Sequence, residues 1–273
     1  MIIIANKCVL ELRIGLYDTL QVSRRRHAMY ETLNTLGFRQ VSLPSGGRSY
    51  RRAGAEQAPI LILFPAIAGL NDYIFQRASA LWNDGFDVCV VDYFAREERP
   101  PDVSTPASIG EAVAGLADQQ VLRDAKEILN VVNTDDRSVG AIGFCIGGMY
   151  AYMCAAQDFG LLAAVDYYGQ IKYDSVSENK PRDPFDMVAE LNAPVLFHFG
   201  DFDRLISHDD IDAFRSSLLE KGAAFEMQTY SGAPHAFDED FRPQSYRPAA
   251  SAEAWSHSRA FLNWYLKHDP VRV

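Results

Sequence analysis

The chain has 273 residues, of which 48% are hydrophobic and 23% charged, a composition typical of a globular protein with enough sequence for one large core. Its formal net charge of −10, with no basic stripe carrying interleaved aromatics, argues against nucleic-acid binding. No apolar run approaches the length of a membrane span, and the apolar opening at residues 1–4 is too short for a signal peptide. We therefore expect a cytoplasmic protein without nucleic-acid or membrane partners.

The first 37 residues fit no regular α/β pattern. Two weakly amphipathic stretches surround an arginine run at 24–26. We predict an N-terminal extension over residues 1–37 and one catalytic domain over residues 38–273. Two interpretations of this extension are open. Met29 could be the natural start, or the extension could form a helical arm that packs on a partner subunit of a homo-oligomer.

The rest of the chain alternates between strand and helix patterns. Residues 38–43 and 48–52 flank a Pro-Ser-Gly-Gly turn and predict a β-hairpin at the edge of a sheet. Further strands are expected near 60–64, 86–91, 138–144, 163–168, 195–199 and 225–230, with helices near 71–84, 108–132, 147–157, 208–221 and 249–266. This order predicts an α/β fold with a mostly parallel central sheet and helices on both faces. The polar segment 172–182 is expected to be a surface loop.

The four cysteines have neither metal-ligand spacing nor a secreted context. They are Cys8, Cys89, Cys145 and Cys154. Cys89 lies in a buried-strand pattern and Cys154 in a helix pattern, so both are interpreted as reduced core residues. We expect neither a metal nor an organic cofactor.

The most informative segment is Gly-Phe-Cys-Ile-Gly-Gly at 143–148, between a strand and a helix. Gly143 and Gly147 leave room for a sharp turn with Cys145 at its apex, which is the pattern of a nucleophile elbow with cysteine in place of serine. The following helix start adds positive potential that favours a thiolate. The alternatives are a buried core cysteine and a redox sensor, although no resolving cysteine is evident in the motif.

An orienting acid is expected after a later strand. The strand at 194–199 runs into Gly-Asp-Phe-Asp at 200–203, at the carboxyl edge of the sheet where Cys145 also lies. We favour Asp203, because Asp201 directly follows the glycine and is better suited to the turn. Both aspartates could instead only cap a turn and start a helix.

The base is expected on the loop after the strand at 225–230. His235 stands there in Gly-Ala-Pro-His-Ala-Phe, which completes the chain order nucleophile, acid, base. The remaining histidines have less suitable positions: His27, His198, His208, His257 and His268. Of these, His198 is expected to be a core residue.

Four segments resemble the dienelactone hydrolase family of α/β-hydrolases and follow one another in the family's order. They are DYFAR at 92–96, GFCIGG, GDFD and GAPHAF. The resemblance covers about residues 40–266. It implies that Cys145 is the nucleophile, His235 the base and Asp203 the orienting acid. It further implies that Arg96 binds a substrate carboxylate, for which a planar guanidinium is suited. The alternative for Arg96 is a solvated surface charge.

The loop at 65–71 is similar to the loop after the family's first central strand. The backbone N–H groups of Ile67 and Ile146 are therefore expected to form the oxyanion hole. The chain differs from the family at two points. It has Ala66 where the family carries a glutamate that helps to switch the cysteine between thiol and thiolate, and Asp238, Glu239 and Asp240 precede Arg242 where a second substrate-binding arginine is expected.

These observations predict a carboxylic ester hydrolase that cleaves a small ester or lactone through a thioester acyl-enzyme. The two departures predict a substrate other than dienelactone, with Cys145 activated by His235 alone and comparable rates on dienelactone and a neutral ester. The alternative is a binding or regulatory module that keeps the fold and turns over poorly. Ala66 is the feature that favours it, and the three triad residues argue against it.

Overall fold

The computed structural model describes residues 31–97 and 100–268. The chain divides into two compact units, Met1–Arg39 and Gln40–Val273. Most of the predicted extension, including Cys8, His27 and Met29, lies outside the described residues, and its boundary at residue 37 stays a prediction. In the described part of the chain no helix combines the length and the apolar character that crossing a membrane requires.

A single sheet of eight strands forms the centre of the larger unit as far as the structure describes it. In sheet order the strands are β1 (Arg39–Ser42), β2 (Arg48–Arg52), β4 (Asp87–Val91), β3 (Ile60–Phe64), β5 (Val139–Phe144), β6 (Leu161–Tyr167), β7 (Val195–Gly200) and β8 (Phe225–Tyr230). β2 is antiparallel to β4, and every pairing from β4 through β8 is parallel. The predicted edge hairpin and the mostly parallel sheet are confirmed.

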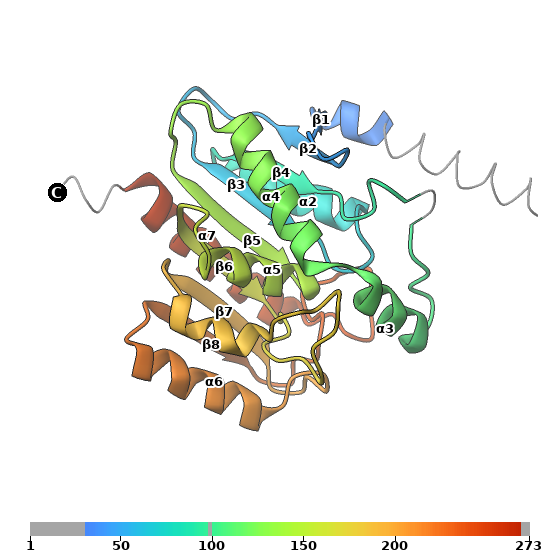
Figure 1. The fold of residues 1–273 in the computed structure, drawn as a ribbon, viewed down its shortest axis with the longest axis vertical. Helices are drawn as coiled ribbons and strands as arrows, with labels where there is room; N and C mark the ends of the chain where they lie inside the picture. Colours follow the sequence, from blue (N-terminus) through green and yellow to red (C-terminus); the bar gives the residue numbers. More distant parts are fainter. Residues whose placement is uncertain (1–30, 98–99, 269–273) are drawn as a thin grey trace, which may run out of the picture. The chain divides into compact units, whose positions relative to one another are not determined.

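Helices cover both faces of this sheet, as predicted. They are α2 (Asp72–Asn83), α3 (Pro106–Gly115), α4 (Asp118–Val132), α5 (Ile146–Ala155), α6 (His208–Lys221) and α7 (Pro248–Lys267), with a short 3-10 helix η1 (Pro184–Glu190). Figure 1 shows α4, α5 and α6 in front of the strands and α2 and α7 behind them. Every residue of β3, β4 and β5 is buried, because helices cover both faces of these central strands.

The helix predicted at 108–132 is two helices. α3 ends at Gly115, and the backbone is extended at Leu116 and Ala117 before α4 begins at Asp118. Glycine favours a helix end over a helix interior. The helical conformation resumes at Asp118, whose N–H donates to Asn179 O at 2.9 Å. The sequence pattern did not show this tertiary contact.

The segment 172–182 is a loop, as predicted, but one of its charges lies inside the protein. Lys180 is 5% exposed, and its Nζ donates to Asp118 Oδ1 at 2.5 Å and to Tyr150 Oη at 3.0 Å. Tyr173 Oη donates to the other oxygen of Asp118 at 2.8 Å. These buried contacts fix the loop to α4 and α5.

The first prediction concerns Asp87, a carboxylate that is 1% exposed at the start of β4. It accepts from Arg51 Nη2 at 2.6 Å and from Arg137 Nη1 at 2.9 Å. Asp87→Ala leaves two guanidiniums without their acid, so we expect the free energy of unfolding in a denaturant titration to fall by about 3–5 kcal/mol.

The matched control for Asp87→Ala is Arg182→Ala. Arg182 pairs with Glu190, and both side chains are more than 40% exposed. This variant should lose less than about 1 kcal/mol, because solvent screens the pair. Equal losses in the two variants would contradict the importance assigned to the buried pair.

Candidate active site

Cys145 lies at the turn between β5 and α5. Its φ of 56° and ψ of −125° are rare for a residue with a side chain. A Cβ on Gly143 would lie 1.9 Å from Gly147 O, so the turn closes only because this position has no side chain. Cys145 N–H donates to Tyr167 O at 2.9 Å, and Cys145 O accepts from Gly148 N–H at 2.9 Å. These bonds fix the cysteine at the carboxyl edge of the central strands.

The loops that follow β7 and β8 pack directly on each other. A Cβ on Gly200 would lie 2.0 Å from Ala233 O, and Phe202 N–H donates to the same carbonyl at 3.0 Å. This packing brings Asp203 and His235 together. Their side chains join through Nδ1 and Oδ2 at 2.8 Å.

In the structure the three predicted triad residues form one chain of side-chain contacts. His235 Nε2 lies 3.2 Å from Cys145 Sγ, while its Nδ1 faces Asp203. The Asp203 side chain has no exposed surface, and its second oxygen accepts from Leu205 N–H at 2.8 Å. Asp201 instead accepts from Gly232 N–H at 2.6 Å and serves the turn, as the sequence suggested.

Two opposing effects act on His235. Burial lowers the pKa of its imidazole, but the nearby Cys145 thiolate and the hydrogen-bonded Asp203 carboxylate raise it, and the net pKa lies well above its ordinary value. The Tyr168 ring packs edge-on against the imidazole, with centroids 5.2 Å apart. The site therefore favours the protonated, imidazolium form of His235.

The other histidine and cysteines that the sequence assigned to the core are buried there. His198 lies between Tyr230 Oη and Ser258 Oγ, each at 2.9 Å, and burial lowers its pKa to about 3. Burial raises the pKa of the Cys89 thiol to about 12, and that of Cys154 is also raised. Both cysteines are free thiols.

The loop at 65–71 lies against the first turn of α5. A Cβ on Gly147 would lie 2.2 Å from Phe64 O, and Tyr93 Oη donates to Pro65 O at 2.9 Å. Ile67 and Ile146 flank this junction with buried side chains, 2% and 5% exposed. Only their backbone N–H groups are suited to contact a substrate oxygen.

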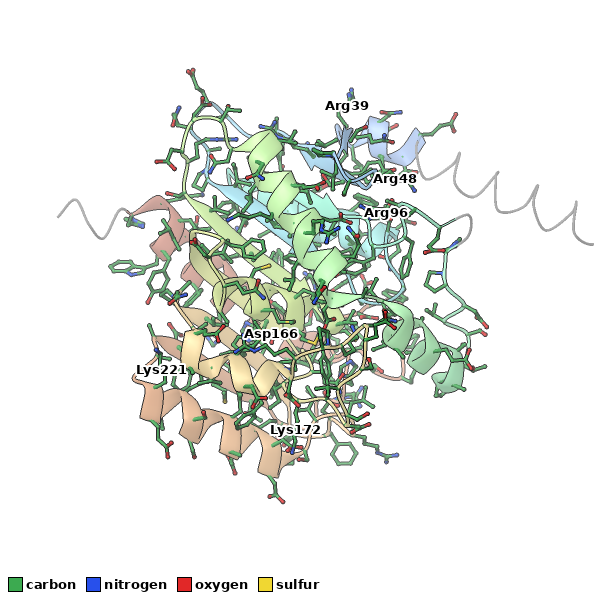
Figure 2. The ribbon with its side chains drawn as sticks, viewed as in Figure 1. Arg39, Arg48, Arg96, Asp166, Lys172 and Lys221 are labelled. Carbon is green, nitrogen blue, oxygen red and sulfur yellow. The ribbon has the colours of Figure 1, made fainter. Side chains whose placement is uncertain are left out.

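Arg96 is bound to a neighbouring carboxylate. Its Nη1 and Nη2 each donate to Asp124 at 2.7 Å, and Nη2 also donates to Ser45 Oγ at 2.6 Å. Asp124 is nearly buried, and Gln120 of the same helix also donates to it. Figure 2 places Arg96 well apart from Asp166, the carboxylate beneath α5. A substrate carboxylate at Arg96 would have to share the guanidinium with Asp124.

The two departures from the family pattern have structural counterparts. Ala66 is 5% exposed and supplies no charge to its loop. Arg242 pairs through Nε with Glu239 at 2.6 Å, and Asp238 accepts from Arg77 at 2.6 Å. Two of the acidic residues after His235, Asp238 and Glu239, therefore bind arginines of the protein itself.

Sequence reasoning missed one buried carboxylate near this site. Asp166 has no exposed surface and stands in the otherwise apolar strand β6. A single charge within an apolar strand is the signal that could have identified it, because unpaired carboxylates are rarely buried. In the described ranges no group of three or more His, Cys, Asp or Glu residues is placed to hold a metal ion.

The sheet is mostly parallel, and Cys145 lies at the apex of a turn between a strand and a helix. Asp203 and His235 follow on later loops. These features define an α/β-hydrolase fold. The model of the dienelactone hydrolase family matches residues 46–266. The chain belongs to this family of carboxylic ester hydrolases, as the sequence motifs predicted.

Relatives in the family agree with this assignment. The "Probable 2-oxo-3-(5-oxofuran-2-ylidene)propanoate lactonase" of a Bradyrhizobium species is 37% identical over 213 residues, which is 76% of this chain and 84% of that protein. The carboxymethylenebutenolidase of Rhodococcus opacus is 26% identical over 76% of this chain and 81% of its own length. A Klebsiella pneumoniae crystal structure described as a "Putative Dienelactone Hydrolase" superposes with a TM-score of 0.76 at 27% identity, covering 84% of this chain and 98% of that one.

The second prediction compares two aspartates of one loop. Asp203→Asn removes the acceptor charge from His235 Nδ1, so kcat/KM for an ester should fall on the order of 10⁴-fold. Asp201→Asn keeps an oxygen for Gly232 N–H and should change kcat/KM by less than about threefold. Steady-state assays with matched circular dichroism spectra test this, and similar losses in both variants would refute the assigned roles.

Proposed function

We propose that the protein hydrolyses a small ester or lactone through a Cys145–His235–Asp203 triad and a thioester acyl-enzyme. The observation that carries the proposal is the pair of contacts made by the His235 ring. Its Nε2 lies 3.2 Å from Cys145 Sγ, and its Nδ1 lies 2.8 Å from Asp203 Oδ2. Both contacts lie in the range expected for a nucleophile, its base and an orienting acid.

In the acylation step the Cys145 thiolate attacks the carbonyl carbon of the substrate. The carbonyl oxygen gains negative charge and accepts hydrogen bonds from the N–H groups of Ile67 and Ile146. When the tetrahedral intermediate collapses, the ester C–O bond breaks and the leaving oxygen takes the proton of the His235 imidazolium. When the substrate is a lactone, the leaving oxygen stays covalently attached to the acyl group, because the cleaved bond belongs to a ring.

In the deacylation step neutral His235 removes a proton from water, and the resulting hydroxide attacks the thioester carbonyl. The C–S bond breaks, the thiolate leaves, and the carboxylic acid product is released. Asp203 stays ionised throughout and stabilises the imidazolium formed in this step. The cycle uses only side-chain and backbone groups of this chain.

The names of two relatives point to the substrate class. One is named for a lactone with a 5-oxofuran-2-ylidene group and the other for a carboxymethylenebutenolide. We propose a small unsaturated lactone or a related ester for this chain. Because Arg96 is bound on both Nη atoms by Asp124, we propose that a substrate carboxylate is not required for turnover.

The third prediction tests the nucleophile. Wild type and Cys145→Ala are assayed on cis- and trans-dienelactone, a neutral p-nitrophenyl ester and a thioester. We expect comparable kcat/KM on dienelactone and the neutral ester, and a loss on the order of 10⁴-fold or more in the variant, because no other group forms the thioester. Acylated protein trapped by mass spectrometry should carry its added mass on Cys145.

Two outcomes would contradict the third prediction. Unchanged turnover in folded Cys145→Ala would remove the cysteine mechanism. A folded wild type that turns over none of the substrates would favour the binding-module alternative.

The fourth prediction concerns Arg96. A guanidinium that bound the substrate carboxylate would make Arg96→Met lose about ten- to a hundredfold in kcat/KM on dienelactones alone, since a hydrogen bond to a charged group is worth about 1.5–3 kcal/mol. We expect instead a similar change on dienelactone and the neutral ester, with lower thermal stability, because Asp124 loses its partner. A loss confined to the dienelactones would establish carboxylate recognition by Arg96.

A further inference from the structure

Tyr93 is a buried tyrosine of the loop that follows β4. The residue is 7% exposed, and its hydroxyl donates to Pro65 O at 2.9 Å. Pro65 is the first residue of the loop at 65–71, whose Ile67 N–H we propose as a donor to the substrate oxygen. Burial holds the pKa of Tyr93 well above its ordinary value, so the hydroxyl keeps its proton and remains a donor.

The backbone of this loop fixes the direction of the Ile67 N–H. Gly69 N–H donates to Ala66 O at 2.8 Å, which closes a turn whose second residue is Ile67. Ala66 O and Ile67 N–H belong to one planar trans peptide group, so they point in opposite directions. Because Ala66 O faces into the turn, the Ile67 N–H faces out of it. Any rotation of this peptide group would therefore turn the donor away from its present direction.

Three contacts from outside the loop hold this turn in place. Tyr93 Oη fixes Pro65 O, and with it the plane of the first peptide group of the loop. The first turn of α5 approaches the same carbonyl, since a Cβ on Gly147 would lie 2.4 Å from it. At the other end of the turn, a Cβ on Gly69 would lie 3.2 Å from Phe94 Cδ2. Of these three contacts, the one from Tyr93 is a hydrogen bond and therefore sets a direction as well as a distance.

A buried ion pair supports the ring that carries the Tyr93 hydroxyl. This ring packs on Tyr150 of α5, with centroids 5.8 Å apart. Tyr150 Oη donates to Asp118 Oδ1 at 2.8 Å and accepts from Lys180 Nζ at 3.0 Å. Lys180 and Asp118 are themselves paired at 2.5 Å. The contacts that fix the loop at 172–182 thus also fix the ring on which Tyr93 packs.

We propose that Tyr93 is a positioning residue of the Cys145 site, whose hydroxyl orients the Ile67 N–H through Pro65 O. This role rests on the proposed cysteine hydrolase, in which negative charge develops on the substrate carbonyl oxygen. Without the Tyr93 hydrogen bond, the first peptide group of the loop is free to rotate. The next peptide group then rotates with it, and its N–H no longer points at the developing charge.

The fifth prediction concerns Tyr93→Phe, which removes one oxygen atom and keeps the ring contacts. We expect kcat and kcat/KM to fall together by about tenfold, with KM within about twofold of wild type, because the affected hydrogen bond is made to the transition state. Complete removal of an oxyanion donor costs about 10²- to 10³-fold in kcat, and a misdirected donor should cost less. Steady-state kinetics on any substrate of the panel that wild type turns over measures this.

Tyr152→Phe is the matched control. Tyr152 is also fully buried, and its hydroxyl also donates to a proline carbonyl, that of Pro184 at 3.1 Å, but this proline begins η1 and not the loop at 65–71. Both variants take one buried hydrogen bond from a proline carbonyl, so both should lower the thermal midpoint of unfolding by similar amounts. Only Tyr93→Phe should lower kcat. Equal losses of kcat in the two variants would show that Tyr93 only supports the fold.

A readout independent of substrate turnover separates this inference from the proposed function. Cys145 is acylated with cinnamoyl imidazole, and isotope-edited infrared spectroscopy records the thioester C=O stretch before the acyl group is lost. In wild type the stretch should lie at lower frequency than in the denatured acyl-protein, because hydrogen bonds to the oxygen weaken the C=O bond. In Tyr93→Phe it should move toward the denatured value, and in Tyr152→Phe it should stay at the wild-type value.

The outcomes distinguish the two claims. A shifted stretch in Tyr93→Phe without turnover of any substrate would retain the inference and refute the proposed function. Turnover by wild type, with both kcat and the stretch unchanged in Tyr93→Phe, would overturn the inference alone. A wild-type stretch equal to that of the denatured protein would also overturn it, and this measurement needs no variant. Failure of Cys145 to take up the acyl group, together with no turnover, would overturn both.

Discussion

The closeness of two backbones at the turn of Cys145 is the constraint on which the site depends. Gly143 and Gly147 approach carbonyl oxygens so closely that a single methyl group at either position would collide with the backbone. The positive φ of Cys145 costs on the order of 1–3 kcal/mol. The parallel strands β3 and β6 on either side of β5, buried except for Leu162, supply the rigidity that maintains it. The same contacts place the loop after β3 beside the first turn of α5, so one packing arrangement positions Cys145 together with the backbone of Ile67 and Ile146.

Charge around this turn is organised by burial. Asp203, Asp124 and Asp118 are all buried, and each meets a basic or hydrogen-bonding partner that compensates its desolvation. Asp166 differs, because its Oδ2 has no hydrogen-bond partner among the described residues, and the charge of His235 only partly opposes the rise in its pKa caused by burial. Among these buried aspartates, Asp166 therefore has the least complete compensation for its desolvation.

Much of this architecture was predictable because it depends on local pattern. Apolar runs of five to seven residues identify buried strands. Because the carboxyl ends of parallel strands share one edge of the sheet, the sequence alone predicted that Cys145, Asp203 and His235 lie close together. Long-range pairing was not predictable. The break at Leu116, the burial of Lys180 and the capture of Arg96 by Asp124 depend on contacts between residues up to 62 positions apart, for which local periodicity carries no information.

Ala66 and Asp203 together indicate which groups control the protonation of His235 in this chain. A carboxylate on the loop after β3 would stand beside the oxyanion donors, where a bound substrate can contact it, but Ala66 leaves that position uncharged. Asp203 supplies charge from the loop after β7, where the complete burial of its side chain prevents contact with substrate. A buried carboxylate responds to pH rather than to a ligand. We therefore expect the protonation of His235 to be set by buried groups of the protein itself before any ligand arrives.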